Sequence, residues 1–155
     1  MAVLLQNKKV YFNYDILETF EAGMKLFGFE VKSLRKREGS LEGSHITIRG
    51  NEAFLLGATI PPYQPKNTPA DYDPARNRRL LLTKKEISKL RGLESQKGLT
   101  IVPISVYNKN HKLKLEIGVA RGKKKYDKRQ TIKERESKRY IDREIKVSRS
   151  RTSRS

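Results

Sequence analysis

The sequence has no cysteine, which excludes disulfide bonds and thiolate metal sites. It has only two histidines, His45 and His111, and surface positions suit both better than catalysis or metal binding. Phosphate-cradling glycine-rich loops and the HExxH and GxSxG motifs are absent too. A nuclease is the only enzyme class that the charge would suit, and no motif supports it. We therefore expect a protein that is not an enzyme and has neither cofactor nor metal.

Long hydrophobic runs are also lacking. The short apolar stretch Val3-Leu4-Leu5 falls far below the roughly 20 residues that a membrane span requires. We expect a soluble protein that is not secreted and works in the cytoplasm. The absence of cysteine is compatible with that reducing compartment.

Acidic residues are scarce relative to basic ones. Seventeen Asp and Glu stand against 35 Lys and Arg, which gives a net charge of +18 and a pI near 10.2. This balance predicts attraction to polyanions, either nucleic-acid phosphates or anionic lipid. Lipid is the weaker alternative, because a membrane-surface helix needs a wide apolar face and residues 121–155 have few apolar side chains. The interleaved Tyr126 and Tyr140 suit stacking on bases better.

The positive charge is concentrated at the C-terminal end. Residues 121–155 hold fifteen Lys or Arg and five Asp or Glu, so they carry +10 of the +18. A segment this charged does not bury enough apolar area to fold alone. Acid-first pairs four residues apart, with Ile141 and Ile145 on a thin apolar stripe, favour a helix once the segment is bound. We expect a folded domain over residues 1–120 and a basic tail over residues 121–155, disordered when free and partly helical when bound.

Alternating hydrophobic residues predict mainly β structure in the first 120 residues. Val10, Phe12, Tyr14 and Ile16 alternate with mostly polar neighbours, which indicates a strand. Further β-prone runs are expected at residues 17–26, 46–48, 53–56, 102–106 and 113–119, the last four forming two hairpins. At least five strands without a βαβ rhythm indicate an antiparallel barrel of the oligonucleotide-binding type with flanking helices.

Two helices and one long loop interrupt the strands. The spacing of Val31 and Leu34 predicts a short helix within residues 27–37. The capping box Thr83-Lys84-Lys85-Glu86 begins a second helix, and Gly98 suits a left-handed position after its end. Residues 61–79 hold five of the six prolines, and proline neither donates ladder hydrogen bonds nor sustains a helix. We expect a long exposed loop there.

Two stretches have competing interpretations. Glu21 lies between Phe20 and Ala22; it is either a solvated strand residue or a carboxylate that accepts hydrogen bonds from base-edge groups or orients an arginine. The arginines at the end of the loop are Arg76, Arg78 and Arg79, next to Leu80-Leu81-Leu82. They form either a charged loop tip leading into a buried segment, or a phosphate clamp that presents a leucine to a partner.

Five motifs, in this order and spacing, carry a family resemblance. They are Phe20-Glu21-Ala22-Gly23, Glu30-Val31-Lys32-Ser33-Leu34-Arg35, Glu52-Ala53-Phe54-Leu55, Asp73-Pro74-x-Arg76-x-Arg78-x-Leu80-Leu81-Leu82 and Gly122-Lys-Lys-x-x-Asp-Lys-Arg129. Together they resemble small protein B, the bacterial SsrA-binding protein family. The resemblance runs from about residue 7 to residue 136 and fades beyond.

The resemblance implies an oligonucleotide-binding-type barrel that is not an enzyme. Such a protein binds the tRNA-like domain of transfer-messenger RNA (tmRNA, or SsrA RNA). With elongation factor Tu, it escorts this RNA to stalled ribosomes for trans-translation, in which the ribosome is rescued and the nascent peptide is tagged. The family's RNA-facing residues map to Asn7, Tyr14, Glu21 and Leu81, and Lys8, Arg35 and Lys124 are expected to contact phosphates or a groove.

For the tail, the resemblance implies insertion into the empty mRNA channel of the ribosome, against 16S rRNA. The residues expected at the decoding centre are Gly122, Lys123, Lys124, Lys125, Tyr126, Asp127, Lys128 and Arg129, with Tyr126 stacking on a base. Helical spacing alone makes Ile141 and Ile145 candidates for docking farther along. The tail would thereby sense vacancy of the channel and replace codon and anticodon. The alternative function is a structural ribosomal or ribosome-assembly protein that holds rRNA permanently.

Overall fold

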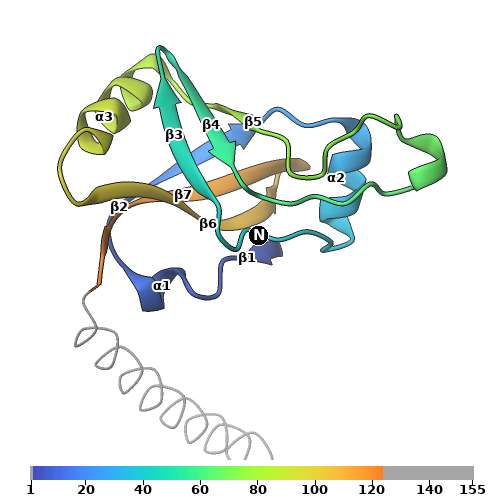
Figure 1. The fold of residues 1–155 in the computed structure, drawn as a ribbon, viewed down its shortest axis with the longest axis horizontal. Coiled ribbons are helices and arrows are strands. Elements are labelled where there is room, and N and C mark those ends of the chain that lie inside the picture. The colour runs from blue at the N-terminus through green and yellow to red at the C-terminus, as the bar shows by residue number, and fades with distance from the viewer. Residues whose placement is uncertain (1, 124–155) are drawn as a thin grey trace, which may run out of the picture.

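The computed structural model describes residues 2–123, and the elements below fall within that range. In chain order they are β1 (Ala2–Gln6), α1 (Val10–Asn13), β2 (Tyr14–Met24), α2 (Gly28–Arg35), β3 (His45–Arg49), β4 (Glu52–Leu56), the 3-10 turn η1 (Pro65–Asn67), β5 (Arg78–Leu81), α3 (Lys84–Glu94), β6 (Leu99–Lys109) and β7 (Lys112–Gly122). Figure 1 shows the strands curled around one core, with α3 at one end and α2 at the other.

The strands form a closed antiparallel ring. Their order is β1-β6-β3-β4-β5-β2-β7, and β6 also pairs with β7 from end to end. This additional pairing joins six strands into a barrel, while β1 lies outside the ring along β6. Closure removes the unpaired edges that an open sheet would expose. The antiparallel β class expected from the sequence, with flanking helices, is confirmed.

The core fills the barrel and extends beneath its helices. Its buried residues include Leu5, Leu34, Leu55, Leu80, Leu90, Ile101, Leu115 and Ile117. Both predicted hairpins are present, as β3–β4 and β6–β7. The predicted capping box of α3 is present as well: the Glu86 amide donates to Thr83 Oγ1 at 3.2 Å, and the Thr83 amide donates to Glu86 Oε1 at 3.1 Å. These local predictions held because their signals lie within a few residues.

The N-terminal region differs from the prediction. The strand expected from residue 10 begins only at Tyr14, because Val10–Asn13 form the single turn α1. Val10 is buried there with Val102, Ile104 and Ala120, so its apolar character reflects packing on the outside of β6 and β7. β1 was not predicted; its apolar residues pair with β6.

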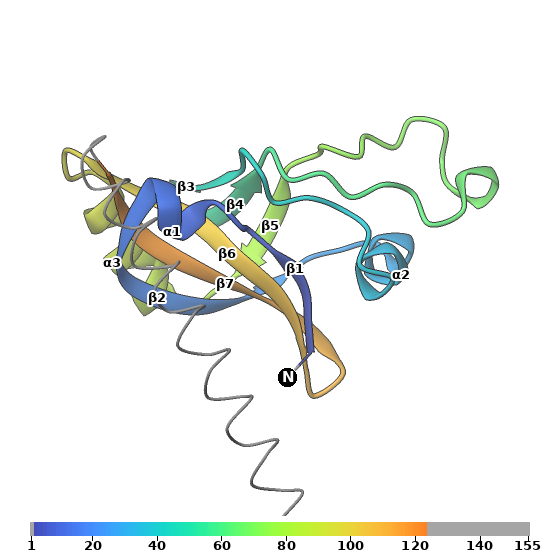
Figure 2. The same cartoon turned by 90° about the horizontal axis from the view of Figure 1, so that it is seen from below.

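The loop expected over residues 61–79 projects from the barrel together with α2 (Figure 2). Its backbone is irregular apart from η1, and it ends where β5 begins at Arg78. At the other boundary, β7 continues two residues past the predicted domain limit, and Gly122 pairs with Tyr14. The folded domain therefore includes Arg121 and Gly122. No helix in the part of the chain described here is long and apolar enough to cross a membrane.

Candidate nucleic-acid interface

One outer surface of the barrel gathers the residues that the sequence singled out. On β2, a register shift between Ile16 and Glu18 turns Tyr14, Ile16, Thr19 and Glu21 to the same outer side. On β7, Leu115 and Ile117 face the core, so Lys114 and Glu116 face outward. We call the outer side of β2, β7 and β6 the outer face.

Leu81 reaches the outer face from the neighbouring strand β5. It pairs with Gly23 of β2, and a Cβ placed on Gly23 would lie only 3.2 Å from the Cβ of Leu81. Leu81 therefore covers the position where a side chain two residues beyond Glu21 would stand. The Leu81 side chain is 53% exposed, whereas Leu80 is 2% exposed in the core. Leu80 therefore agrees with the interpretation of this stretch as a buried segment. Leu81 agrees with the interpretation in which a leucine is presented to a partner.

Glu21 is exposed but held on two sides. The Tyr107 hydroxyl donates a hydrogen bond to Glu21 Oε2, and Lys109 Nζ lies 3.2 Å from the same oxygen and 3.3 Å from Oε1. The hydrogen bond from Tyr107 is the main cause that keeps the pKa of Glu21 below its ordinary value; partial desolvation opposes it, and Lys109 and Lys114 add to it. Glu21 is therefore an ionised, acceptor-only group near neutral pH.

A second group of predicted residues lies at the α1 end of the outer face. Asn7 and Tyr14 line the same surface depression, of about 320 Å³, together with Asn13 and His45. Asn7 is fixed there because its side-chain amide donates to the Pro103 carbonyl at 3.0 Å. Lys8 is exposed next to Asn7, at the edge of an adjoining depression. The structure thus brings Asn7, Lys8 and Tyr14 together.

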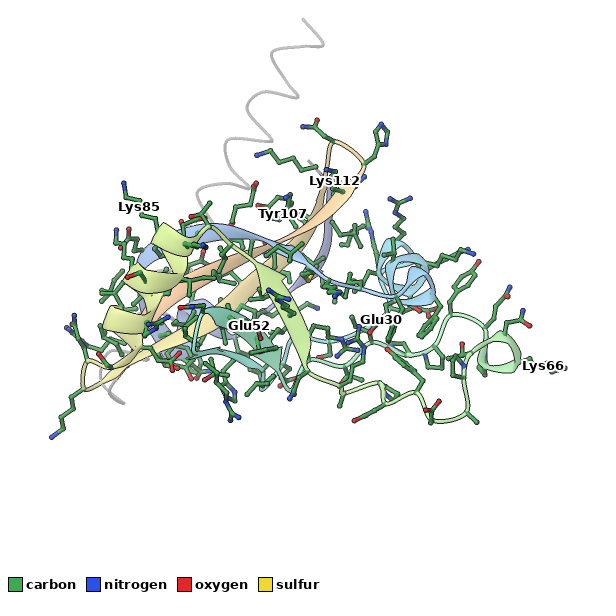
Figure 3. The ribbon with its side chains drawn as sticks, turned by 90° about the horizontal axis from the view of Figure 1, so that it is seen from above. Glu30, Glu52, Lys66, Lys85, Tyr107 and Lys112 are labelled. Atoms are coloured by element: carbon green, nitrogen blue, oxygen red, sulfur yellow. The ribbon has the colours of Figure 1, made fainter. Side chains whose placement is uncertain are left out.

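Cations border the other end of the outer face, at the tip of the β6–β7 hairpin. The Arg35 guanidinium donates to the His111 carbonyl at 3.1 Å, so the end of α2 touches the hairpin. Lys109, Lys112 and Lys114 come from the hairpin itself, and Lys112 lies near its tip in Figure 3. An apolar and carboxylate-bearing surface with cations at its border can meet bases while the cations meet phosphates.

The phosphate clamp predicted for the loop arginines is wrong for Arg78. Its side chain is 0% exposed, and it donates from Nη2 to Glu30 Oε2 at 2.9 Å and from Nη1 to the Ala58 carbonyl at 2.6 Å. Arg76 also binds the Glu30 carboxylate, and its guanidinium lies 4.2 Å from the centre of the Phe27 ring. Both arginines join α2 to the loop, because cationic partners stabilise a buried carboxylate. Arg76 keeps 26% of its side chain exposed, and its contact with RNA stays a prediction.

The buried partner of these arginines is Glu30 on α2, labelled in Figure 3. The Glu30 side chain is 0% exposed. Its carboxylate also accepts from the Phe27 amide at 2.8 Å and lies 2.9 Å from the Tyr72 hydroxyl. Burial acts to raise the pKa of Glu30, but these hydrogen bonds and those from Arg76 and Arg78 outweigh it, and the pKa lies below its ordinary value. Burial and then Glu30 raise the pKa of Tyr72.

Two of the residues predicted for the tail belong to the folded domain. Gly122 is the last residue of β7, and the Lys123 amide donates to the Asn13 carbonyl at 2.9 Å. Lys123 Nζ donates to the Tyr11 carbonyl at 2.9 Å and lies 3.7 Å from Asp15. The structure thus ties Lys123 to α1. The remaining predicted tail residues lie outside the described range: Lys124, Lys125, Tyr126, Asp127, Lys128, Arg129, Ile141 and Ile145.

Sequence reasoning did not single out Tyr107 or Lys109. Their hydrogen bonds to Glu21 join residues 86 and 88 positions apart, and only the pairing of β6 with β7 and of β7 with β2 brings them together. Residues 2–123 contain no cluster of three or more His, Cys, Asp or Glu side chains that could hold a metal ion. The arrangement offers hydrogen bonding, stacking and charge, all of them means of binding.

The closed antiparallel barrel, with its helices at the ends and its cation-bordered outer face, defines the class: a small barrel of the oligonucleotide-binding type. Within that class, the model of the SmpB protein family matches residues 4–147, and the chain belongs to this family.

Relatives cover nearly the whole chain. An SsrA-binding protein of Thermosipho africanus is 49% identical over 150 residues, which are 96% of this chain and 100% of the relative. One of Persephonella marina is 49% identical over 93% of this chain and 94% of its own length. A chain in the solved structure described as "tmRNA-SmpB: a journey to the center of the bacterial ribosome" is 43% identical, with a TM-score of 0.66, over 80% of this chain and 87% of that one.

Proposed function

We propose that the protein binds the tRNA-like domain of tmRNA and delivers it, with elongation factor Tu, to stalled ribosomes for trans-translation. Membership of the SmpB family and relatives named SsrA-binding protein support this function. The observation that carries it is that Asn7, Tyr14, Glu21 and Leu81 line one side of a closed barrel. The protein acts by binding and not by catalysis, in the cytoplasm where ribosomes work.

In this proposal the outer face recognises the RNA. An ionised carboxylate repels phosphates, so Glu21 favours only an RNA that turns base amino or imino groups, or ribose hydroxyls, toward it. Leu81 supplies an apolar contact beside that carboxylate. Lys8 and Arg35, at opposite ends of the outer face, neutralise phosphates and set the orientation. Lys124 adds a phosphate contact where the tail begins.

In this proposal the tail binds the ribosome. Lys123 lies against α1, which fixes the point on the barrel where the tail begins. The tail residues that we assign to the ribosome are Lys125, Tyr126, Asp127, Lys128 and Arg129. We place these residues in the decoding centre, where Tyr126 stacks on a base of 16S rRNA. Ile141 and Ile145 dock a helix in the empty mRNA channel. Because mRNA in the channel would occupy the same sites, the tail responds only to a vacant channel and replaces codon–anticodon pairing.

A binding titration tests recognition. The full chain and a version ending at Lys123 are compared at one salt concentration against the tRNA-like domain of tmRNA, an ordinary tRNA and a ribosomal RNA fragment. Salt is fixed because counterion release alone can imitate specificity. The truncation follows Lys123 because β7 runs to Gly122 and Lys123 contacts α1.

The expected result is that the truncated barrel still prefers the tRNA-like domain, since the outer face remains intact. A preference that disappears with the tail, or never exists, would contradict the assignment of Glu21 and Leu81. It would favour a structural ribosomal or ribosome-assembly protein, which would also remain stoichiometric on salt-washed ribosomes.

A further inference from the structure

We propose that Tyr107 is the positioning residue for Glu21: its buried hydroxyl holds the Glu21 carboxylate in the orientation in which that carboxylate meets RNA. The inference rests on the proposed function, because it takes Glu21 to contact the tRNA-like domain. It extends the recognition unit from β2 across β7 to β6.

The register places Tyr107 diagonally across one strand from Glu21. Glu21 pairs with Glu116 of β7, while Tyr107 of β6 pairs with Lys114, two residues earlier on β7. The Tyr107 side chain thus crosses β7 between these rows to reach Glu21 Oε2. The position opposite Lys114 on β2 is Gly23, over which Leu81 lies.

Tyr107 and Lys109 contribute differently to Glu21. Tyr107 is 7% exposed, so its ring is fixed by packing and its hydroxyl has one place to point. Lys109 is 43% exposed on a flexible stem and acts as a mobile point charge. Lys109 therefore supplies charge compensation, and Tyr107 supplies direction.

The hydrogen bonds leave Glu21 able to accept more. An ionised carboxylate has about four lone-pair sites. Tyr107 takes one on Oε2, and the bridging Lys109 ammonium lies between the two oxygens at 3.2 and 3.3 Å. At 38% side-chain exposure, the remaining sites face solvent. A fixed carboxylate with open acceptor sites is preorganised for donors on a base edge or a ribose.

The protonation states agree with this geometry. Burial, and then the hydrogen bond to Glu21, raise the pKa of Tyr107, so its hydroxyl keeps the proton that it donates. The same hydrogen bond is the main cause that lowers the pKa of Glu21. Donor and acceptor thus retain their roles together through the neutral range.

The test substitutes Tyr107→Phe in the full chain, which keeps the ring and removes only the hydroxyl. We expect affinity for the tRNA-like domain of tmRNA to fall about tenfold at fixed salt, the scale of one hydrogen bond to a charged group. Non-specific binding to ordinary tRNA should not fall. The carboxyl pKa of Glu21, followed by carbon-13 NMR, should rise toward its ordinary value.

A double-mutant cycle separates positioning from general stability. In a Glu21→Gln background, Tyr107→Phe should cost almost no further RNA affinity, because its effect passes through the carboxylate. Tyr72→Phe is the matched control: it removes the same hydroxyl from the buried Glu30 and should lower thermal stability while the folded protein keeps its affinity for RNA.

The outcomes distinguish the two claims. If the unaltered protein has no preference for the tRNA-like domain, the proposed function fails. If that preference exists but Tyr107→Phe binds as tightly as the unaltered protein, or its cost adds fully to that of Glu21→Gln, the positioning role is wrong.

Discussion

Two glutamates in this protein each contact a tyrosine hydroxyl and cationic side chains, but in opposite surroundings. The Glu30 side chain has no exposed surface and contacts Tyr72 and two arginines, whereas the Glu21 side chain is 38% exposed on the outer face and contacts Tyr107 and a lysine. The acceptor sites of the Glu30 carboxylate are all occupied by protein donors. Some acceptor sites of the Glu21 carboxylate remain open to solvent. Burial, more than residue type, decides whether such a carboxylate holds the fold together or serves recognition.

The cationic partners of the two glutamates also differ. Arginine binds Glu30, where the planar guanidinium of Arg78 reaches the carboxylate and three backbone carbonyls at once. Lysine binds Glu21, where a compact ammonium compensates charge without enclosing the group. The comparison predicts that changes around Glu30 alter stability and changes around Glu21 alter binding.

The largest effect is expected from Arg78→Met. Removing one partner of a buried ion pair leaves an uncompensated charge on Glu30, and we expect a loss of about 3 to 5 kcal/mol in the free energy of unfolding. Urea denaturation measures it. Lys112→Met, a cation removed from the exposed hairpin tip, is the control and should change stability by less than about 0.5 kcal/mol. An Arg78→Met protein of unaltered stability would remove the basis of the comparison.

The adjacent leucines Leu80 and Leu81 give the next contrast. Leu80→Ala should cost about 2 to 4 kcal/mol of stability because it leaves a cavity in the core. Leu81→Ala should leave the melting temperature nearly unchanged and weaken binding to the tRNA-like domain. Thermal unfolding and RNA titration of both variants check this. Equal stability losses would show that Leu81 packs as Leu80 does.

Acid should lower the stability of the fold through Glu30. The pKa of Glu30 is lower in the folded protein, so its contribution to stability is present above the unfolded pKa and is lost as pH falls through the folded pKa. Melting temperature should therefore decline below about pH 5, the scale set by an ordinary carboxyl pKa. Glu30→Gln, less stable at neutral pH, should show a shallower decline. A parallel decline would assign the acid sensitivity to other carboxylates.

The smallest stability effect is expected from Glu21→Gln. The side chain is exposed and its charge interactions are solvated, so the unfolding free energy should change very little. Affinity for the tRNA-like domain should nevertheless fall. If the melting temperature drops sharply instead, Glu21 is a structural residue like Glu30 and the contrast between them disappears.

Local signals in the sequence predicted local structure well. The Thr83 capping box and the two hairpins depend on residues close together in the sequence, and all three were found. The burial of Arg78 was not predicted, because an arginine beside leucines fits a loop tip as well as a core. Only the distant Glu30, 48 residues away, decides between them.

In the candidate site, too, local features were predicted and long-range contacts were not. The motif around Glu21 drew attention to the carboxylate, and the exposure of Leu81 agreed with one of two prior readings. The alternation of apolar and polar residues did not single out Tyr107, because in an alternating strand it resembles any other partly apolar residue. Its partner becomes known only when the register of three strands is known.

The pairing of β2 with β7 fixes the distance between Glu21 and the start of the tail. Tyr14 pairs with Gly122, next to the start of the tail, and Glu21 lies seven residues farther along β2. Because β2 has one extra residue at the register shift between Ile16 and Glu18, β7 advances only six residues over this span, from Gly122 to Glu116. At about 3.3 Å per residue, the carboxylate is separated from the origin of the tail by about 20 Å along the strand. Because both strands are locked in one closed ring, that length is rigid. In the proposed function, the barrel would thus hold the RNA contact at Glu21 at a fixed distance from the point where the tail begins.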